Sequence, residues 1–236
     1  MSLTTTYMIL QAEARIYLQN QRGIFQTADF QSFYTFNFGT YHAESREPFG
    51  NLLALNDEML LPQRNCEIKT SETVRIVLIP LAGALEINDG SEDIKYVNSG
   101  EVLEYLAEPD KSLVITNPYS NETVNYLQIR FKEEVNALFY SRLTPFDLSG
   151  KNALLTITND QEQSNRILIG QYDGREESTF ICNPSKAVFI FVIEGAFEVQ
   201  NRLLEKRDGL SLRNVSEVEF EALSNNAILL IMEVEL

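Results

Sequence analysis

Four polar side chains that could do chemistry recur at every second position in one short stretch: Lys69, Ser71, Thr73 and Arg75. Alternate residues of a regular β-strand share one face, so this spacing predicts two cations and two hydroxyls on one surface. An arginine binds a carboxylate or phosphate through two parallel hydrogen bonds, and a buried lysine can lose its proton and act as an amine. The stretch therefore predicts an anion-binding face.

Less reactive interpretations stay open for the two cations. Lys69 could be a lysine at the rim of a domain, with its ammonium in solvent. Arg75 could form an internal ion pair with an acid such as Glu86 or Glu104. A bend before Thr73 would also rotate Lys69 away from the shared face.

Nucleophilic catalysis is not favoured, because the chain has a single histidine, His42. A serine or cysteine nucleophile normally needs a neighbouring base such as histidine, which leaves Ser71 without one. Cys66 and Cys182 fall in different halves of the chain and are expected to be two separate, reduced, buried thiols. His42 itself is expected to lie in a surface loop and not to bind a metal.

Composition bounds the class of protein. The 236 residues are 44% hydrophobic and 10% aromatic, enough for a packed core and too much for a disordered chain. Lys and Arg total 19 against 34 Asp and Glu, a formal net charge of −15. Nucleic-acid binding needs cations that meet phosphates, so a general DNA or RNA surface is excluded. Without a basic-then-apolar leader or a run of about 18 apolar residues, the chain is expected to be cytoplasmic, with no membrane contact.

A near-repeat divides the chain into two similar halves. Residues 80–87 read Pro-Leu-Ala-Gly-Ala-Leu-Glu-Ile, and residues 192–199 read Val-Ile-Glu-Gly-Ala-Phe-Glu-Val. Each copy is an apolar strand, a glycine turn and a second strand. The repeat predicts one β-domain used twice.

Most of the chain alternates short apolar runs with turn signals, as in a sandwich or barrel. The run from Val74 to Leu81 is rich in β-branched residues and too short for a comfortable helix, which favours a strand. Asn56-Asp57-Glu58 predicts a turn after a strand at residues 50–55, because short polar side chains favour turns. Asn88-Asp89-Gly90 predicts a hairpin. Further strands are expected at residues 7–10, 14–18, 33–38, 102–106, 113–116, 126–131, 153–158, 166–172, 178–182, 187–193, 196–199, 218–222 and 228–235.

This rhythm breaks between the two halves. Glu133 to Arg142 predicts a short helix, which Pro145 and Ser149-Gly150 close. The expected organisation is an N-terminal domain over residues 1–132, a linker over 133–151 and a C-terminal domain over 152–236. The extreme N-terminus is expected to cross over and pair with the second domain.

Five short motifs follow one another along the first half. They are Phe36-Asn37-Phe38-Gly39 with Tyr41, Phe49-Gly50-Asn51-Leu52 with Leu55-Asn56-Asp57, Leu81-Ala82-Gly83-Ala84-Leu85-Glu86, Ser99-Gly100-Glu101-Val102, and Asn117-Pro118 with Leu127-Gln128-Ile129. In sequence and in order they resemble motifs of the pirin family, which includes the bacterial pirin-like quercetinases. Residues 152–236 resemble the second cupin of the bacterial members. The resemblance implies an all-β bicupin, with two antiparallel cupin (jelly-roll) β-barrels joined by a short helical linker.

The resemblance also implies one iron in the N-terminal barrel, held by an H-P-H pair, a later His and a Glu. Counted from the motifs, these ligand positions fall on Lys69, Ser71, Leu113 and Ile115, and the glutamate of the general cupin motif falls on Arg75. Lysine is cationic, serine is a poor ligand, and leucine and isoleucine have no donor atom. Transition metals need converging imidazole or carboxylate groups, so neither a metal nor another cofactor is expected.

Three functions remain. The first is a non-catalytic module, structural or binding a small anionic or aromatic molecule, with candidate pocket residues Lys69, Ser71, Arg75, Leu113 and Ile115. The second is a cofactor-independent enzyme that uses polar groups of the N-terminal cavity for proton transfer or isomerisation. The third is a quercetin 2,3-dioxygenase-type metalloenzyme, which would require a different register for the ligands. Exposed barrel edges also offer a route to a homodimer.

Overall fold

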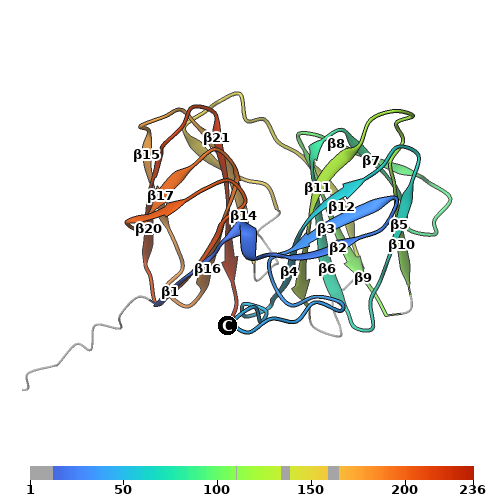
Figure 1. Cartoon of the computed structure of the whole chain (residues 1–236), viewed down its shortest axis with the longest axis horizontal. Coiled ribbons are helices and arrows are strands. Elements are labelled where there is room, and N and C mark those ends of the chain that lie inside the picture. Colours follow the sequence, from blue (N-terminus) through green and yellow to red (C-terminus); the bar gives the residue numbers. More distant parts are fainter. Residues whose placement is uncertain (1–12, 110, 134–138, 159–164) are drawn as a thin grey trace, which may run out of the picture.

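The computed structural model describes residues 13–109, 111–133, 139–158 and 165–236. These residues form two β-barrels that lie side by side (Figure 1), each made of a large sheet facing a small one. The strands pair antiparallel throughout the described residues. The expected all-β fold of two antiparallel barrels is confirmed. No helix of the described part has the length and apolarity needed to cross a membrane.

The first barrel closes a seven-stranded sheet, in the order β12-β9-β6-β11-β4-β3-β2, against a four-stranded sheet in the order β5-β10-β7-β8. Its strands are β2 (Gly23–Gln26), β3 (Phe30–Tyr34), β4 (Leu52–Leu60), β5 (Asn65–Lys69), β6 (Val74–Ala82), β7 (Ala84–Asn88), β8 (Lys95–Asn98), β9 (Glu101–Ala107), β10 (Ser112–Thr116), β11 (Val124–Lys132) and β12 (Ser141–Pro145).

The second barrel closes a six-stranded sheet, in the order β1-β19-β16-β21-β14-β13, against a four-stranded sheet in the order β15-β20-β17-β18. Its strands are β1 (Glu13–Tyr17), β13 (Ala153–Thr156), β14 (Ile167–Tyr172), β15 (Glu177–Ile181), β16 (Ala187–Glu194), β17 (Phe197–Val199), β18 (Arg202–Leu204), β19 (Gly209–Arg213), β20 (Glu217–Ala222) and β21 (Ala227–Val234). A single 3-10 turn, η1 (Gln19–Gln21), is the helical element of the described residues.

Two glycine turns occupy equivalent places in the barrels, as the near-repeat predicts. Gly83 joins β6 to β7 with φ +82°, and Gly195 joins β16 to β17 with φ +75°. Glycine adopts this left-handed conformation without the steric cost that a Cβ brings. At Gly83 an added Cβ would also lie 2.8 Å from a methyl group of Val124.

Strand β6 is buried on both faces, which explains its nearly continuous apolar sequence. Ile76 and Leu78 pack inside the first barrel, whereas Val77 and Ile79 belong to an apolar cluster shared with the second barrel. Alternate side chains of a strand point to opposite faces, so both sets must be apolar or paired. Position along the strand therefore decides whether a residue faces the barrel interior or the joint between the barrels.

Strand β1 pairs with the second barrel although it precedes the first one in the chain. Ile16 lies opposite Leu210 and Tyr17 opposite Gly209, and Figure 1 shows this blue strand crossing to the second barrel. The Tyr17 ring packs 5.3 Å from the ring of Phe189, centre to centre. The expected crossover is confirmed for residues 13–17, while the strand expected at 7–10 lies outside the described residues. The domain boundaries at 132 and 152 stay a prediction.

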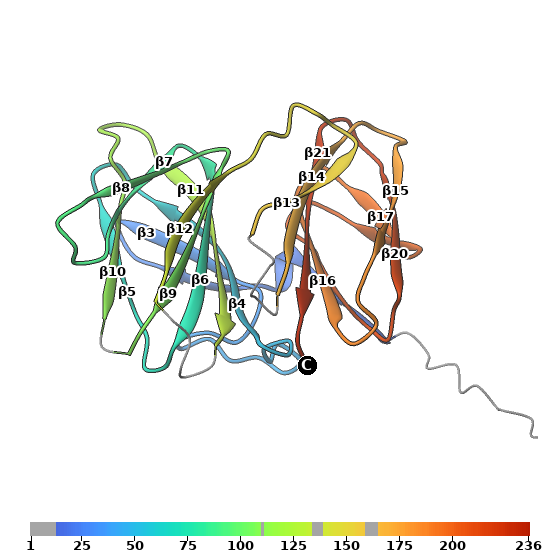
Figure 2. The same ribbon diagram turned by 180° about the vertical axis from the view of Figure 1, so that it is seen from behind.

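The helix expected over Glu133 to Arg142 is wrong at its C-terminal end. Ser141–Pro145 forms β12, an edge strand paired with β9, and residues 134–138 lie outside the described part. Proline cannot donate a ladder hydrogen bond, and an edge strand tolerates that loss. Beyond β12 the chain passes over to the second barrel (Figure 2).

A buried carboxylate joins the two barrels. Asp57 of β4 lies 3.2 Å from Nη1 of Arg22 and 3.0 Å from Nε of Arg207, through its Oδ2. Its Oδ1 accepts a hydrogen bond of 2.7 Å from Asn125. The Asp57 side chain is 9% exposed, and Arg207 also donates to the Ile193 carbonyl of the second barrel at 2.8 Å. A buried charge is tolerated when it is paired and hydrogen-bonded in this way.

The substitution Asp57→Asn tests this joint. We expect it to lower the free energy of unfolding by about 3–5 kcal/mol, because Arg22 and Arg207 lose their shared counter-charge while the side-chain shape is kept. Urea unfolding followed by circular dichroism measures the loss.

Asp29→Asn is the matched control, because it breaks an exposed ion pair. The Arg64 and Asp29 side chains are 58% and 49% exposed, with Nε and Oδ1 3.1 Å apart. Removing such a pair should change stability by less than about 1 kcal/mol. Equal losses in the two variants would contradict a special role for Asp57.

Candidate functional site

The two polar positions expected at the centre of the pocket lie on the surface. Strand β5 ends at Lys69, and residues 70–73 form a connection before β6 begins. The Lys69 side chain is 68% exposed, and its Nζ lies 3.0 Å from Oε2 of Glu67. Ser71 is exposed as well. The prediction that Lys69, Ser71 and Arg75 share one face is therefore wrong, because the chain turns between them.

Arg75 is fully buried but points away from the interior of the first barrel. It lies on the face of β6 that Val77 and Ile79 turn toward the second barrel. Its Nη1 donates to Glu104 Oε2 at 3.2 Å, and its Nη2 donates to the backbone carbonyl of Asn165 at 3.0 Å. The internal ion pair with Glu104, one of the alternatives for this residue, is confirmed.

Leu113 and Ile115 occupy the interior of the first barrel. They are 1% and 0% exposed and share an apolar cluster with Ile68, Leu85 and Ile87. Their burial agrees with the apolar character expected at these positions. The five candidate residues nevertheless do not line one hollow, since two are exposed, one lies at the joint and two are core. A ligand role for any of them stays a prediction.

The residues at these positions do not fit the iron site that the family resemblance implies. An exposed ammonium, an exposed hydroxyl and two hydrocarbon side chains packed in a core supply no converging donors for a transition metal. Within the described residues, no three His, Cys, Asp or Glu side chains lie close enough together to hold a metal ion.

A cluster of polar side chains inside the first barrel centres on Glu58, which is 3% exposed. Its Oε1 accepts hydrogen bonds from Ser32 Oγ at 3.2 Å and Asn56 Nδ2 at 3.4 Å, and its Oε2 accepts one from Gln128 Nε2 at 2.9 Å. Burial raises the pKa of Glu58, and the hydrogen bonds of its neighbours oppose that shift. The buried Oδ1 of Asn56 has no hydrogen-bond partner. The cluster therefore lacks one hydrogen-bond donor, at Asn56 Oδ1.

Alternation along β4 positions this cluster. The turn expected at residues 56–58 is wrong, because these residues lie within the strand Leu52–Leu60. Asn56 and Glu58 face the interior together with Leu60, and Asp57 faces the joint. Polar residues favour turns when their own backbone is the nearest partner, whereas here buried side chains of neighbouring strands supply the hydrogen bonds.

The cysteine nearest to the cluster is not a nucleophile. Cys66 Sγ lies 3.3 Å from the hydroxyl of Tyr126, and either atom could donate. Burial raises the pKa of Cys66 to about 12 and that of Tyr126 well above its ordinary value. A thiol that stays protonated at neutral pH reacts poorly. Both Cys66 and Cys182 are free, as expected, although Cys66 is only partly buried, and His42 is exposed in a loop, also as expected.

Arg130 extends the cluster to the end of the barrel where β3 and β11 both finish. Its Nε donates to Gln128 Oε1 at 2.6 Å, and its guanidinium carbon lies 4.8 Å from the centre of the Phe38 ring. Burial lowers the pKa of Arg130. Sequence reasoning missed this group, although polar Gln128 and Arg130 alternate with apolar residues in a predicted strand. That alternation was the available signal.

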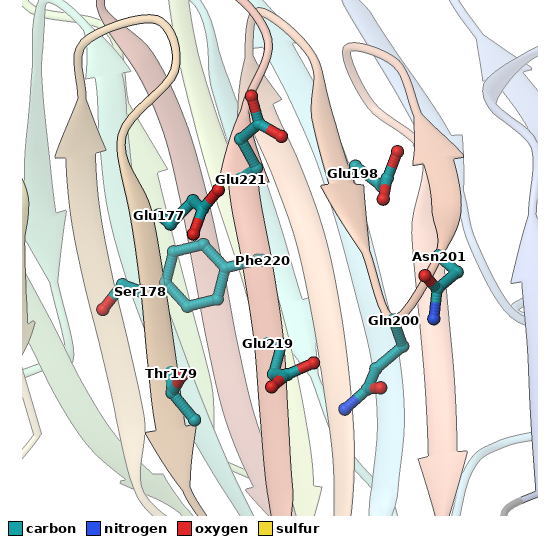
Figure 3. Close-up of a pocket in the computed structure, with 9 residues that line it drawn as sticks. All are labelled: Glu177, Ser178, Thr179, Glu198, Gln200, Asn201, Glu219, Phe220 and Glu221. Atoms are coloured by element: carbon teal, nitrogen blue, oxygen red, sulfur yellow. The ribbon is translucent and has the colours of Figure 1, made fainter.

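A hollow of about 470 Å³ lies on the outer face of the sheet β15-β20-β17-β18 and carries four glutamates. Figure 3 shows them spread over β15, β17 and β20, among polar side chains that point outward. Their charge would repel an anion. The glutamates are Glu177, Glu198, Glu219 and Glu221.

A second hollow, of about 380 Å³, lies between the barrels. Its walls are largely apolar, with Ile79, Phe146 and Ile193 among them. The ammonium of Lys206 on its wall lies 2.7 Å from Oε2 of Glu194, so this cation is already paired. None of the candidate pocket residues lines either hollow.

Comparison with known proteins gives matches over both barrels. Residues 149–234 match the family model of the quercetinase C-terminal cupin domain. The provisionally named quercetin 2,3-dioxygenase PM1685 of Pasteurella multocida (strain Pm70) is 20% identical over 212 residues, which cover 85% of this chain and 90% of the relative.

Solved structures share the two-barrel arrangement. The bacterial pirin YhhW of Escherichia coli, in complex with nickel(II), matches with a TM-score of 0.83 and 20% identity, over 94% of this chain and 99% of that chain. The protein YhaK of Escherichia coli matches with a TM-score of 0.73 and 17% identity, over 92% and 95%. The family model over the second barrel, the relative that spans both barrels and the shared fold together support the resemblance to a pirin-family bicupin.

Proposed function

We propose that this pirin-family bicupin binds a small molecule in its first barrel and uses no metal there. The observation that carries the proposal is the character of the four positions where the family resemblance puts iron ligands. Lys69 and Ser71 are exposed, and Leu113 and Ile115 belong to the apolar core. The nickel(II) of YhhW and the provisional name of PM1685 belong to those proteins, and neither property carries over under this proposal.

The polar half of the first barrel supports a binding role. Glu58, Gln128 and Arg130 form a hydrogen-bonded row that ends near the rim, and the buried Asn56 carbonyl lacks a donor. A structural core gains nothing from an unpaired polar atom, because leaving it unpaired costs about 1–3 kcal/mol. A ligand or water that donates to Asn56 would remove that cost.

Metal analysis tests the proposal directly. After incubation with Fe(II) or Ni(II) and removal of loosely bound ions, the protein should hold far less than one metal per chain, because converging ligands are lacking. Inductively coupled plasma mass spectrometry measures the content, and an oxygen-uptake assay with quercetin should show no turnover. Close to one tightly held metal per chain, or metal-dependent quercetin oxidation, would refute the proposal.

The substitution Leu113→Ala tests whether the former ligand position is now core. We expect a loss of about 2–5 kcal/mol in the free energy of unfolding, because the change leaves a cavity in a packed interior. The control Lys69→Ala changes an exposed residue at another of the four positions, and its free energy of unfolding should stay within about 0.5 kcal/mol of wild type. If Leu113→Ala were as stable as the control, the interior around Leu113 would be loosely packed, and metal ligands could be accommodated there.

Cofactor-independent proton transfer is a second candidate function, and Glu58 is the observation that favours it. Its raised pKa means that the folded protein holds this proton more tightly than the unfolded chain does. The contribution of Glu58 to stability is then fully present below the unfolded pKa and is lost as pH rises through the folded pKa. A carboxyl whose pKa is raised by burial is a candidate for general acid–base work.

The variant Glu58→Gln should reveal this linkage. Relative to wild type, its free energy of unfolding should improve as pH rises above the ordinary glutamate pKa of about 4.3, because only the wild type loses the Glu58 contribution. Urea unfolding at a series of pH values measures the difference. The control Glu67→Gln should run parallel to wild type over this range, because the hydrogen bond from Lys69 lowers the pKa of Glu67 and confines its linkage to more acidic pH. Parallel pH profiles for wild type and Glu58→Gln would remove the second candidate.

A further inference from the structure

The half-buried guanidinium of Arg130 makes few hydrogen bonds and no ion pair within the described residues. Its Nε is bonded to Gln128, while its two terminal amino groups have no acceptor among the described residues. Neither nitrogen is one of the fully buried polar atoms that lack a hydrogen-bond partner, so both are in contact with solvent. Within the described residues no carboxylate lies within ion-pair distance of Arg130.

Three other arginines with enclosed side chains are paired with acids, and the buried Arg46 is hydrogen-bonded through both terminal nitrogens to Thr35, Leu18 and Gln21. Arg22 and Arg207 share Asp57, and Arg166 contacts Glu233 at 3.1 Å. A guanidinium that is partly desolvated without a counter-ion is costly unless something else supplies the charge. Glu58 supplies part of that charge at longer range, and an external anion would supply the rest.

Gln128 explains why Arg130 does not simply pair with Glu58. The amide donates to Glu58 through Nε2 and accepts from Arg130 through Oε1, so it separates the two charges. It also fixes the guanidinium by its Nε edge. The terminal amino groups then remain available as a fork, which matches the two oxygens of a carboxylate.

A small cluster of aromatic rings adjoins Arg130 through Phe38. Phe38 lies under the guanidinium, and the Tyr34 ring lies 5.1 Å from Phe38 and 6.4 Å from Tyr41, centre to centre. Tyr34 ends β3 and lies opposite Asn56 of β4, which on its other side lies opposite Gln128 of β11. Offset or edge-to-face packing on such rings favours a flat aromatic group over a flexible chain.

We propose that Arg130 binds the carboxylate of a small aromatic acid at this end of the first barrel, with Tyr34 and Phe38 against the acid's ring. The inference rests on the proposed binding function and names the ligand class for that site. Arg75, the arginine selected from the sequence, cannot serve, because it is fully enclosed at the joint with Glu104.

Calorimetric titration with sodium benzoate tests the proposal. Wild type should bind benzoate more tightly than benzamide, which has the ring without the charge, and more tightly than acetate, which has the charge without the ring. Arg130→Met should weaken benzoate at least about thirtyfold, because the carboxylate loses its only counter-charge. Arg130→Lys should keep weak binding, since it retains the charge and loses the fork.

Two further variants keep the test decisive. Arg175→Met removes an arginine whose side chain is 82% exposed in the second barrel and should leave benzoate binding unchanged. Phe38→Leu should weaken benzoate and leave acetate unaffected, which holds even if Arg130→Met fails to fold. Absence of benzoate binding in wild type, or equal affinity in Arg130→Met and Arg175→Met, would overturn the inference. A stoichiometric metal found with benzoate binding intact would overturn the proposed function and leave the Arg130 site standing.

Discussion

Burial of both faces of the strands β4, β6 and β11 is the constraint on which this structure depends. One set of alternate side chains fills the first barrel, and the other set packs against the second barrel. Neither face is open to water along most of the strand, so each polar side chain must find a partner inside the protein. Neighbours in sequence consequently have unrelated environments. Asp57 joins the barrels, whereas Glu58 lies within one of them.

The joint between the barrels carries charges as well as apolar contacts. The carboxylate of Asp57 and the guanidinium of Arg75 each contact opposite charges and groups of the second barrel. Removing one partner of such a set is expensive, because the other charge stays buried. These contacts, together with the crossing of β1, favour a fixed arrangement of the two barrels over independent motion.

Within the first barrel, apolar and polar residues divide the interior. Leu113 and Ile115 have joined the core at the positions where the family resemblance puts metal ligands, and the polar groups gather around Glu58 and Arg130. A metal site needs several donors that converge. Under the proposed function, hydrocarbon side chains fill the space that such donors would occupy. The polar row instead offers single groups of opposite charge, which suits recognition of a small ionised molecule.

The sequence by itself determined the all-β class, the duplicated barrel and the identity of the residues at the ligand positions. Hydrophobic alternation, turn glycines such as Gly83 and short motifs are local properties. They can be recognised in the sequence without knowing which strands pair. Short strands such as β5 and β18 have no such signal, because their pairing comes from strands distant in the chain. Only the tertiary structure decided that residues 56–58 lie within a strand and that Lys69 and Arg75 face different surroundings. It also decided that Arg130 forms no ion pair with an acid among the described residues. Each of these depends on strand register and on contacts between residues far apart in sequence, which determine where a polar side chain can be satisfied.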